Sequence, residues 1–496
     1  MTDLTLLLDR RLLRAKGHAL PRQRRLYELL RQAILDGRLP AGSALPASRV
    51  LAHELGLARN SVIHAYEQLG AEGYVQASRQ GTVVAALPDR RAAVATGQAV
   101  SSVPTAGLAA PPPALSDRIQ AFNRRRTAEQ DLMPFMPGIP ALDEFPLRTW
   151  RRLLNAAWRD QSPDLLSYRP AVGELELRQA IATYVRAARG VVCTLDQVIV
   201  TDGTQDSLSL CAHALADVGQ RAWIEHPGYG GARVACLAAG LKVVPVPMDE
   251  QGLAPPKALW RRQPPRLIYT TPSHQYPLGS VMPLARRLAL IEQAQAAGAW
   301  ILEDDYDSEF RHDGPPLAAM QGLVPHAPVI YLGTFSKSMF PALRLGFMVV
   351  PASLSDRLQG ALGDLVRRGL PAEQTALAAF INEGHFTKHL RKMRQLYAQR
   401  QAALREALSR HWPWPGEVLG GACGLHLVLT LPPDIPDADA AQAAMKKGLS
   451  PRPLSAYGTG GPPLNGLVIG YANLPAEQMD TRVKQLVRAI SAGLAR

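Results

Sequence analysis

A segment with neither helical nor strand periodicity limits how this chain of 496 residues can fold. Residues 87–116, LPDRRAAVATGQAVSSVPTAGLAAPPPALS, are rich in Ala, Pro, Gly and Ser, a composition typical of linkers. A chain of this length also exceeds one ordinary core. We therefore expect a small domain at residues 1–86, a flexible linker at 87–115 and a larger domain at 116–496.

The larger region alternates strand-like and helical patterns. Apolar runs such as QVIVTDG, RLIYTTP, AWILEDD and VIYLGTFS are separated by helical segments such as LARRLALIEQAQAAG. This order predicts an α/β domain built on a mostly parallel sheet, with helices on both faces.

Charge and cysteine usage narrow the class of protein. The net charge of +13 favours a polyanionic partner, although excess charge is also a solubility device. The four cysteines form no CxxC pair, which argues against a zinc site or a disulfide framework. Residues 2–17 lack the uninterrupted apolar core of a signal peptide, and no apolar run is long enough for a bilayer. We expect a cytoplasmic protein without metal or membrane partner.

The N-terminal region carries a helix-turn-helix pattern followed by a wing. Residues 25–37, RLYELLRQAILDG, predict a first helix. Residues 47–56, ASRVLAHELG, predict a second helix with Ser48 as its N-cap and Gly56 as its end. Residues 58–73 predict a third, with Val62, Tyr66 and Leu69 on one face, and residues 74–86 predict two short strands.

The third helix is the candidate recognition helix, because residues at its start reach base edges in the major groove. Residues 1–90 hold thirteen Lys and Arg against eight Asp and Glu, so this region is basic, at +5. Three helices and a hairpin can also form a protein-interaction module. If this region binds DNA, the residues expected to face the bases are Arg59, Asn60, Ser61 and His64. The residues expected to contact phosphates are Arg49 and Arg79.

The segments AILDGRLPAGSALPASRVLAHELG, LARNSVIHAYEQLGAEGYV and GTVV resemble the winged helix of GntR-type regulators. The resemblance covers the whole N-terminal region. It implies binding to double-stranded operator DNA through the positions occupied here by Arg49, Arg59, Asn60, Ser61 and the wing glycine, Gly81.

In the larger region, GTFSKSMFPALRLGF at 333–347 follows an apolar strand. Lys337, flanked by hydroxyls, is the candidate to hold an aldehyde cofactor as a Schiff base. Arg344 can bind the cofactor phosphate bidentately, and Thr334 can add a hydroxyl. A lone lysine is usually a solvated surface group. The hypothesis of a Schiff base at Lys337 therefore depends on the other segments of this region.

The context includes ILEDDYDSEF at 301–310, a carboxylate cluster at a strand end, where open α/β sheets bind ligands. Asp304 can keep a pyridine nitrogen protonated and Tyr306 can bond the ring hydroxyl, although alone the cluster fits a solvated acidic turn.

Three further segments lie where such a cofactor needs them. Residues 201–208, TDGTQDSL, open a helix where Thr204 and Gln205 can meet a phosphate. Tyr229, in HPGYGGAR, can stack on a ring. Residues 271–279, TPSHQYPLG, form a compact loop that can line the ring edge.

Residues 116–496 resemble a fold-type I aminotransferase, and the whole chain resembles the MocR/GabR class of GntR-type regulators. This implies pyridoxal 5'-phosphate as cofactor and a smaller C-terminal α+β subdomain. Lys337 would carry the Schiff base, and Tyr168, in SYRPAVGELELRQAIATY, would reach the phosphate of a neighbouring subunit in a homodimer. The other implied cofactor contacts are Asp304, Tyr306, Tyr229, Thr204, Gln205, Thr334 and Arg344.

One position departs from the aminotransferase pattern. Those enzymes place a carboxylate-binding arginine in the strand matching GLVIGYA, residues 466–472, where this chain has Leu467, Val468 and Ile469. Arg452 and Arg233 are possible substitutes. The departure leaves an amine, an amino acid or pyridoxal phosphate itself open as the effector.

These patterns favour a regulator that senses an effector through its cofactor. An active aminotransferase with a basic appendage is the alternative, and a regulator that keeps the fold only as a dimerisation scaffold is a third.

Overall fold

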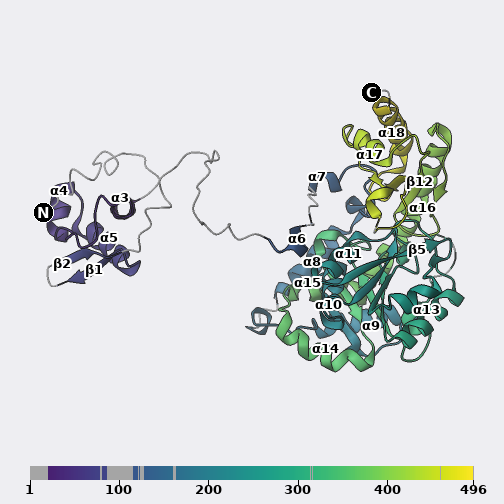
Figure 1. Cartoon of the computed structure of the whole chain (residues 1–496), viewed down its shortest axis with the longest axis horizontal. Coiled ribbons are helices and arrows are strands. Elements are labelled where there is room, and N and C mark those ends of the chain that lie inside the picture. The colour runs from purple at the N-terminus through teal and green to yellow at the C-terminus, as the bar shows by residue number, and fades with distance from the viewer. Residues whose placement is uncertain are drawn as a thin grey trace. The chain divides into compact units, whose positions relative to one another are not determined.

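The computed structural model describes residues 21–78, 81–86, 115–120, 122, 128–159, 163–312, 314, 317–458 and 460–494. Contacts between Cα atoms divide the chain into two compact units, Met1–Pro112 and Pro113–Arg496, which are drawn in Figure 1 and described separately below. The N-terminal segment 1–20, the predicted phosphate contact Arg79 and residues 87–114 of the predicted linker lie outside the described residues.

The small unit is a winged helix-turn-helix, as predicted. A buried core that includes Leu26, Leu51, Val62 and Leu69 joins its three helices. The elements are α3 (Arg22–Leu35), α4 (Ser48–Leu55), α5 (Arg59–Ala71) and the antiparallel pair β1 (Val75–Ser78) and β2 (Gly81–Val84).

One local prediction for this unit needs correction. Ser48 is the first residue of α4 rather than its N-cap; Ala47 is the N-cap, and no side-chain cap bond forms there among the described residues. Tyr66 packs against the core that contains Val62 and Leu69, as the predicted shared face requires, and its side chain is half-buried. The Tyr66 hydroxyl donates a 2.9 Å hydrogen bond to the carbonyl of Pro46.

The large unit is built on an eight-stranded sheet in the order β3-β10-β9-β8-β7-β4-β5-β6. Strands β9, β8, β7, β4 and β5 are parallel, whereas β10 and β6 run antiparallel to their neighbours, so the mostly parallel sheet is confirmed. The strands are β3 (Val198–Thr201), β4 (Arg221–His226), β5 (Lys242–Asp249), β6 (Gly252–Leu253), β7 (Leu267–Thr270), β8 (Trp300–Asp305), β9 (Val329–Thr334) and β10 (Gly346–Val349).

Both faces of this sheet are covered. In β4, Trp223 belongs to one buried cluster, whereas its neighbours Ala222 and Ile224 belong to another, as the two-residue period of a strand requires. The clusters are completed by helices that include α10 (Thr204–Leu215), α11 (Gly230–Ala238), α13 (Leu284–Ala297) and α14 (Ala352–Leu365).

A smaller subdomain follows, with a four-stranded antiparallel sheet in the order β11-β12-β14-β13. This confirms the α+β subdomain. Its elements are β11 (Val418–Leu419), β12 (His426–Thr430), α17 (Asp437–Met445), β13 (Arg452–Pro453), β14 (Gly466–Gly470) and α18 (Met479–Leu494).

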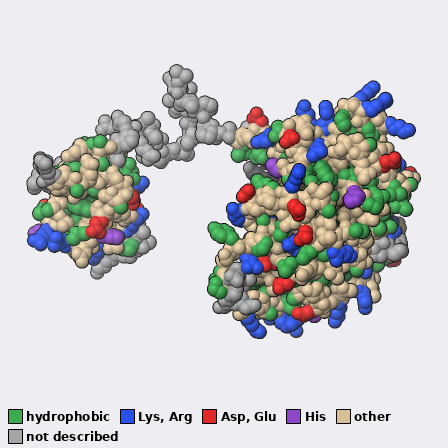
Figure 2. Space-filling view, turned by 90° about the horizontal axis from the view of Figure 1, so that it is seen from below, with side chains coloured by type: hydrophobic (Ala, Val, Ile, Leu, Met, Phe, Trp, Pro, Cys, Tyr) green, Lys and Arg blue, Asp and Glu red, His purple; other side chains and the backbone are tan. Residues whose placement is uncertain are grey.

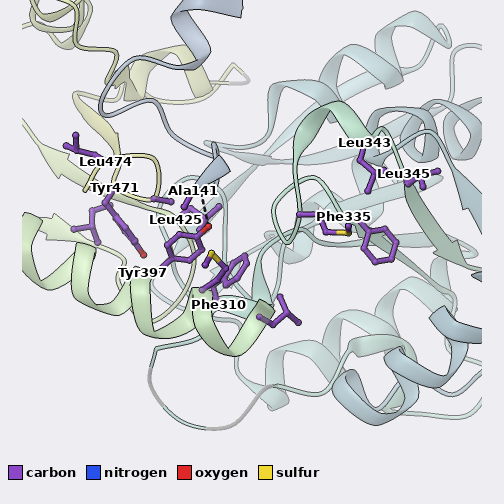
Figure 3. Close-up of a cluster of buried hydrophobic side chains, with 14 of the residues drawn as sticks. Ala141, Phe310, Phe335, Leu343, Leu345, Tyr397, Leu425, Tyr471 and Leu474 are labelled. Atoms are coloured by element: carbon purple, nitrogen blue, oxygen red, sulfur yellow. Dashed lines mark hydrogen bonds between the residues drawn. The ribbon is translucent and has the colours of Figure 1, made fainter. Parts of the chain in front are cut away.

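One buried cluster connects the subdomain to the main sheet (Figure 3). Tyr397, on the long helix α16 (His385–His411), accepts a 3.0 Å hydrogen bond from the backbone N–H of Ala141, which ties the segment before α8 to this helix. The remaining α-helices are α6 (Asp117–Gln120), α7 (Ala128–Asp131), α8 (Leu147–Arg159), α9 (Leu175–Arg189), α12 (Lys257–Arg262) and α15 (Pro371–Asn382).

Charged side chains of both signs lie on the surface of the large unit. Figure 2 shows Lys and Arg side chains spread over the visible face and interspersed with acidic ones. In the part of the chain that the structure describes, no helix combines the length and the apolar character needed to cross a bilayer.

Candidate functional site

A cavity of about 490 Å³ in the large unit gathers most of the predicted cofactor residues. Tyr168 is the exception, since it is absent from the described lining and its side chain is 90% exposed. The predicted residues that line the cavity are Thr204, Gln205, Tyr229, Asp304, Tyr306, Thr334, Lys337 and Arg344.

The reversed direction of β10 explains why three distant segments meet on one side of this cavity. Strand β10 lies between β3 and β9 and is antiparallel to both, so its start is at the same sheet edge as their ends. Thr204 follows β3, Thr334 ends β9, and Arg344 precedes β10. A helix N-terminus, a hydroxyl and a guanidinium therefore converge, which is the chemistry of a phosphate site.

Lys337 faces the cavity from the connection between β9 and β10. Its Nζ donates a 2.6 Å hydrogen bond to the carbonyl of Gly138. A Cβ at Gly138, where φ is +78°, would lie 3.0 Å from that nitrogen. The glycine thus permits the close approach that holds the amine in place.

Asp304 is the last but one residue of β8, and its carboxylate is buried in the cavity wall. Its Oδ2 accepts a 2.8 Å hydrogen bond from the Tyr269 hydroxyl, and burial raises the pKa of Asp304 to about 7. Its Oδ1 is buried and has no hydrogen-bond partner among the described residues. An unsatisfied buried carboxylate oxygen fits a ligand N–H such as a protonated pyridine nitrogen.

Tyr306 has a partner that the sequence interpretation did not single out. Its hydroxyl is 2.9 Å from Nδ1 of His274, whose Nδ1 also lies 3.0 Å from both carboxylate oxygens of Asp307. Both residues belong to segments noted in the sequence, the loop 271–279 and the acidic cluster. Only the fold shows that these segments touch.

Arg452 lines the cavity, whereas Arg233 is not part of its described lining. Arg452 lies on β13 directly across from Val468 of β14, the strand that lacks the expected arginine. Twelve residues, 454–465, separate the two strands, and the periodicity of the sequence does not indicate that they pair. The guanidinium therefore enters the site from the neighbouring strand at the same level of the sheet.

Four of the DNA-binding candidates lie in the first two turns of α5, whereas Arg49 lies on α4 and Gly81 on β2. Arg49, Arg59, Asn60 and His64 are exposed, and Ser61 is half-buried. Gly81 opens β2 with φ +111°, a conformation that favours glycine.

Comparisons with known proteins assign a family to each of the two units. Residues 22–84 match the model for bacterial regulatory proteins of the gntR family, and residues 131–486 match aminotransferase class I and II. The chain is 41% identical over 476 residues to the probable rhizopine catabolism regulatory protein MocR of Rhizobium meliloti, covering 95% of this chain and 94% of that protein.

The chain is a MocR-type regulator of the GntR family.

Other relatives place this MocR-type regulator within the same family. It is 32% identical over 473 residues to the pyridoxine biosynthesis transcriptional regulator PdxR of Corynebacterium glutamicum, covering 94% of this chain and 96% of that protein. Its large unit resembles LysN, an α-aminoadipate aminotransferase of Thermus thermophilus solved with N-(5'-phosphopyridoxyl)-L-leucine, with a TM-score of 0.67 and 27% identity over 73% of this chain and 93% of LysN. The MocR-type regulator thus combines a DNA-binding unit with a fold whose family depends on pyridoxal phosphate.

Proposed function

We propose that the large unit of this MocR-type regulator binds pyridoxal 5'-phosphate in the cavity and uses it to sense a small molecule. The observation that carries the proposal is the buried Oδ1 of Asp304, which has no hydrogen-bond partner among the residues that the structure describes, in a cavity that the Lys337 side chain also lines. A carboxylate for the ring nitrogen and an amine for the aldehyde are the two groups that such a cofactor requires. When bound, the cofactor supplies an aldehyde that reacts with primary amines.

The cavity residues divide into three roles in this proposal. Tyr229 stacks on the ring and Tyr306 bonds the ring hydroxyl. The phosphate is held by Thr204, Gln205, Thr334 and Arg344. Tyr168 contributes to the site of a second subunit, which is consistent with its exposed side chain, and makes the regulator a homodimer.

The effector is a primary amine, an amino acid or pyridoxal phosphate itself. Arg452 favours a ligand with an anionic group, because its guanidinium lines the cavity and can bind a carboxylate bidentately. In the small unit, Arg49, Arg59, Asn60, Ser61, His64, Arg79 and Gly81 contact operator DNA.

Borohydride reduction tests the cofactor site. After reconstitution with pyridoxal phosphate and reduction, mass spectrometry is expected to find the pyridoxyl adduct on Lys337 and on no other lysine. Lys337→Ala is expected to abolish the adduct, whereas Lys257→Ala, at an exposed position, leaves it intact. An adduct elsewhere, or none in the unmodified protein, contradicts the proposal.

An active aminotransferase is the second candidate function, favoured by the likeness to LysN. The discriminating measurement is turnover with several amino donors, alongside gel shifts with operator and scrambled duplexes at a stated salt concentration. Rapid multiple turnover without specific DNA binding would support the enzyme over the regulator.

A further inference from the structure

His274, Asp307 and Cys423 form a buried cluster behind the cavity wall. Their side chains come from the loop after β7, the segment after β8 and the segment before β12, and each is almost fully buried. Gly424 allows this approach: its φ is +88°, and a Cβ there would lie 2.3 Å from the His274 ring and 2.4 Å from the Asp307 carboxylate. The contact geometry of this cluster determines which atoms carry hydrogen.

The distances around the His274 ring indicate that its Nδ1 carries a hydrogen. Its Nδ1 lies 3.0 Å from both oxygens of the Asp307 carboxylate, so Nδ1 must carry a hydrogen, since a lone pair there would face negative charge. The Tyr306 oxygen, 2.9 Å from the same nitrogen, therefore faces a donor. The Tyr306 oxygen accepts a hydrogen bond from Nδ1–H of His274. The Tyr306 O–H is therefore available to donate to a different acceptor. Burial raises the pKa of Tyr306 well above its usual value, so the phenol keeps its proton.

A metal site is the competing interpretation of the same cluster. Nδ1 of His274, a carboxylate oxygen of Asp307 and Sγ of Cys423 lie within 4.8 Å of one another, as ligands of one ion would. However, the Cys423 thiol donates a 3.5 Å hydrogen bond to the backbone carbonyl of Asp307. Burial also raises the pKa of this thiol well above its usual value, whereas a metal needs the thiolate. Hydrogen bonding accounts for the geometry better than a metal does.

The other groups around His274 do not compete for Nδ1. His426 lies with its ring centroid 5.3 Å away and donates from Nε2 to the carbonyl of Pro277. Burial lowers the pKa of His426 to about 3, so this ring is neutral. Tyr276 packs edge-on against Tyr306, and its hydroxyl contacts that of Tyr457.

We propose that His274 is a positioning residue for Tyr306. Asp307 holds the imidazole with hydrogen on Nδ1, the imidazole holds the phenol oxygen, and the Tyr306 O–H is thereby directed into the cavity toward the ring oxygen of the cofactor. This inference rests on the proposed function, because Tyr306 lines the cavity assigned to pyridoxal phosphate.

The test is a pH titration of the absorbance of the bound cofactor. A hydrogen bond to the ring oxyanion stabilises the anion, so losing it raises the pH of the spectral transition, by about one unit for Tyr306→Phe. His274→Leu is expected to shift the transition in the same direction. His274→Asn is expected to restore the wild-type value, because its amide N–H replaces Nδ1–H. Cys423→Ala is the packing control and should not shift it.

The double variant separates a positioning role from a structural one. If His274 acts through Tyr306, His274→Leu adds no shift in the Tyr306→Phe background. An equal shift in both backgrounds, no shift in either, or a stoichiometric metal ion in the purified protein would overturn the inference. The tautomer is measured independently by ¹⁵N NMR of cofactor-free, histidine-labelled protein, with the His274 signals assigned from the Asn variant. Hydrogen on Nε2 alone would contradict the inference, whereas a wild-type protein without cofactor absorbance would contradict the proposed function.

Discussion

Nζ of Lys337 is hydrogen-bonded to the carbonyl of Gly138, 199 residues earlier in the chain. The segment that carries Gly138 is itself tied to α16 through Ala141 and Tyr397. The position of the amine therefore depends on a segment outside the strand connection that carries it. This dependence can be tested at the glycine.

Gly138→Ala is expected to weaken cofactor capture by about tenfold. The added methyl lies 3.0 Å from Nζ and must displace it. Gly298→Ala is a matched control, since Gly298 also has a positive φ of +64° but open space around a Cβ. Each substitution should cost about 1 kcal/mol of stability from backbone strain, measured by urea unfolding. Equal effects of the two variants on the yield of borohydride-trapped adduct would refute the specific role of Gly138.

Asp304→Asn should change stability in a pH-dependent way. Burial raises the pKa of Asp304 from its usual 3.8 to about 7, so the folded state binds its proton more tightly than the unfolded state does. The contribution of Asp304 to the free energy of unfolding therefore falls as pH rises from about 4 to 7. Cofactor-free Asp304→Asn is expected to gain stability relative to wild type between pH 5 and pH 8, on the order of 1 kcal/mol.

The same variant should lose affinity for pyridoxal phosphate, because an amide supplies no charge to a pyridinium. Asp364→Asn, at an exposed position of α14, is the control for both measurements. A pH-independent difference between Asp304→Asn and wild type would show that Asp304 does not titrate in this range.

Arg452→Gln should distinguish classes of effector. Loss of the guanidinium is expected to reduce the affinity for amino-acid effectors by tenfold or more, and to leave amines without a carboxylate unaffected. Changes in the cofactor spectrum on titration with matched pairs of amino acids and amines provide the measurement. Arg233→Gln serves as control, and a larger effect at Arg233 would reverse the assignment.

Arg59→Ala should weaken binding to an operator selected from random duplexes, by about tenfold, while the adduct at Lys337 still forms. Arg59 is exposed at the first position of α5, where side chains reach base edges. Arg38→Ala, at a residue that pairs with Asp36, is the control. Gel shifts in which Arg59→Ala binds operator and scrambled DNA with unchanged preference would contradict base readout.

Tyr168 can be tested by mixing subunits. If it serves the neighbouring subunit, a mixed dimer of Lys337→Ala and Tyr168→Phe chains contains one site with both wild-type residues. The mixture should then bind cofactor with wild-type affinity at one site per mixed dimer, whereas Tyr168→Phe alone binds about tenfold more weakly. Weak binding in the mixture would place Tyr168 in its own subunit's site.

The sequence best predicted those features whose residues all lie within one segment. The strand runs, the helical segment that forms α13 and the connection containing Lys337 and Arg344 are all local, so periodicity and residue type predict them. Contacts between segments far apart in sequence were not predictable. His274 meets Asp307 only because β7 and β8 are neighbours, and Arg452 lies beside Val468 of β14 only because β13 pairs with that strand.

In the part of the chain that the structure describes, each unit is built around buried clusters of its own. A recombination event that joins a different winged helix to the same sensor would leave each core intact. If the large unit is the sensor proposed here, DNA-binding specificity and ligand specificity can change independently, and the large unit can be joined to a different DNA-binding domain in a hybrid biosensor.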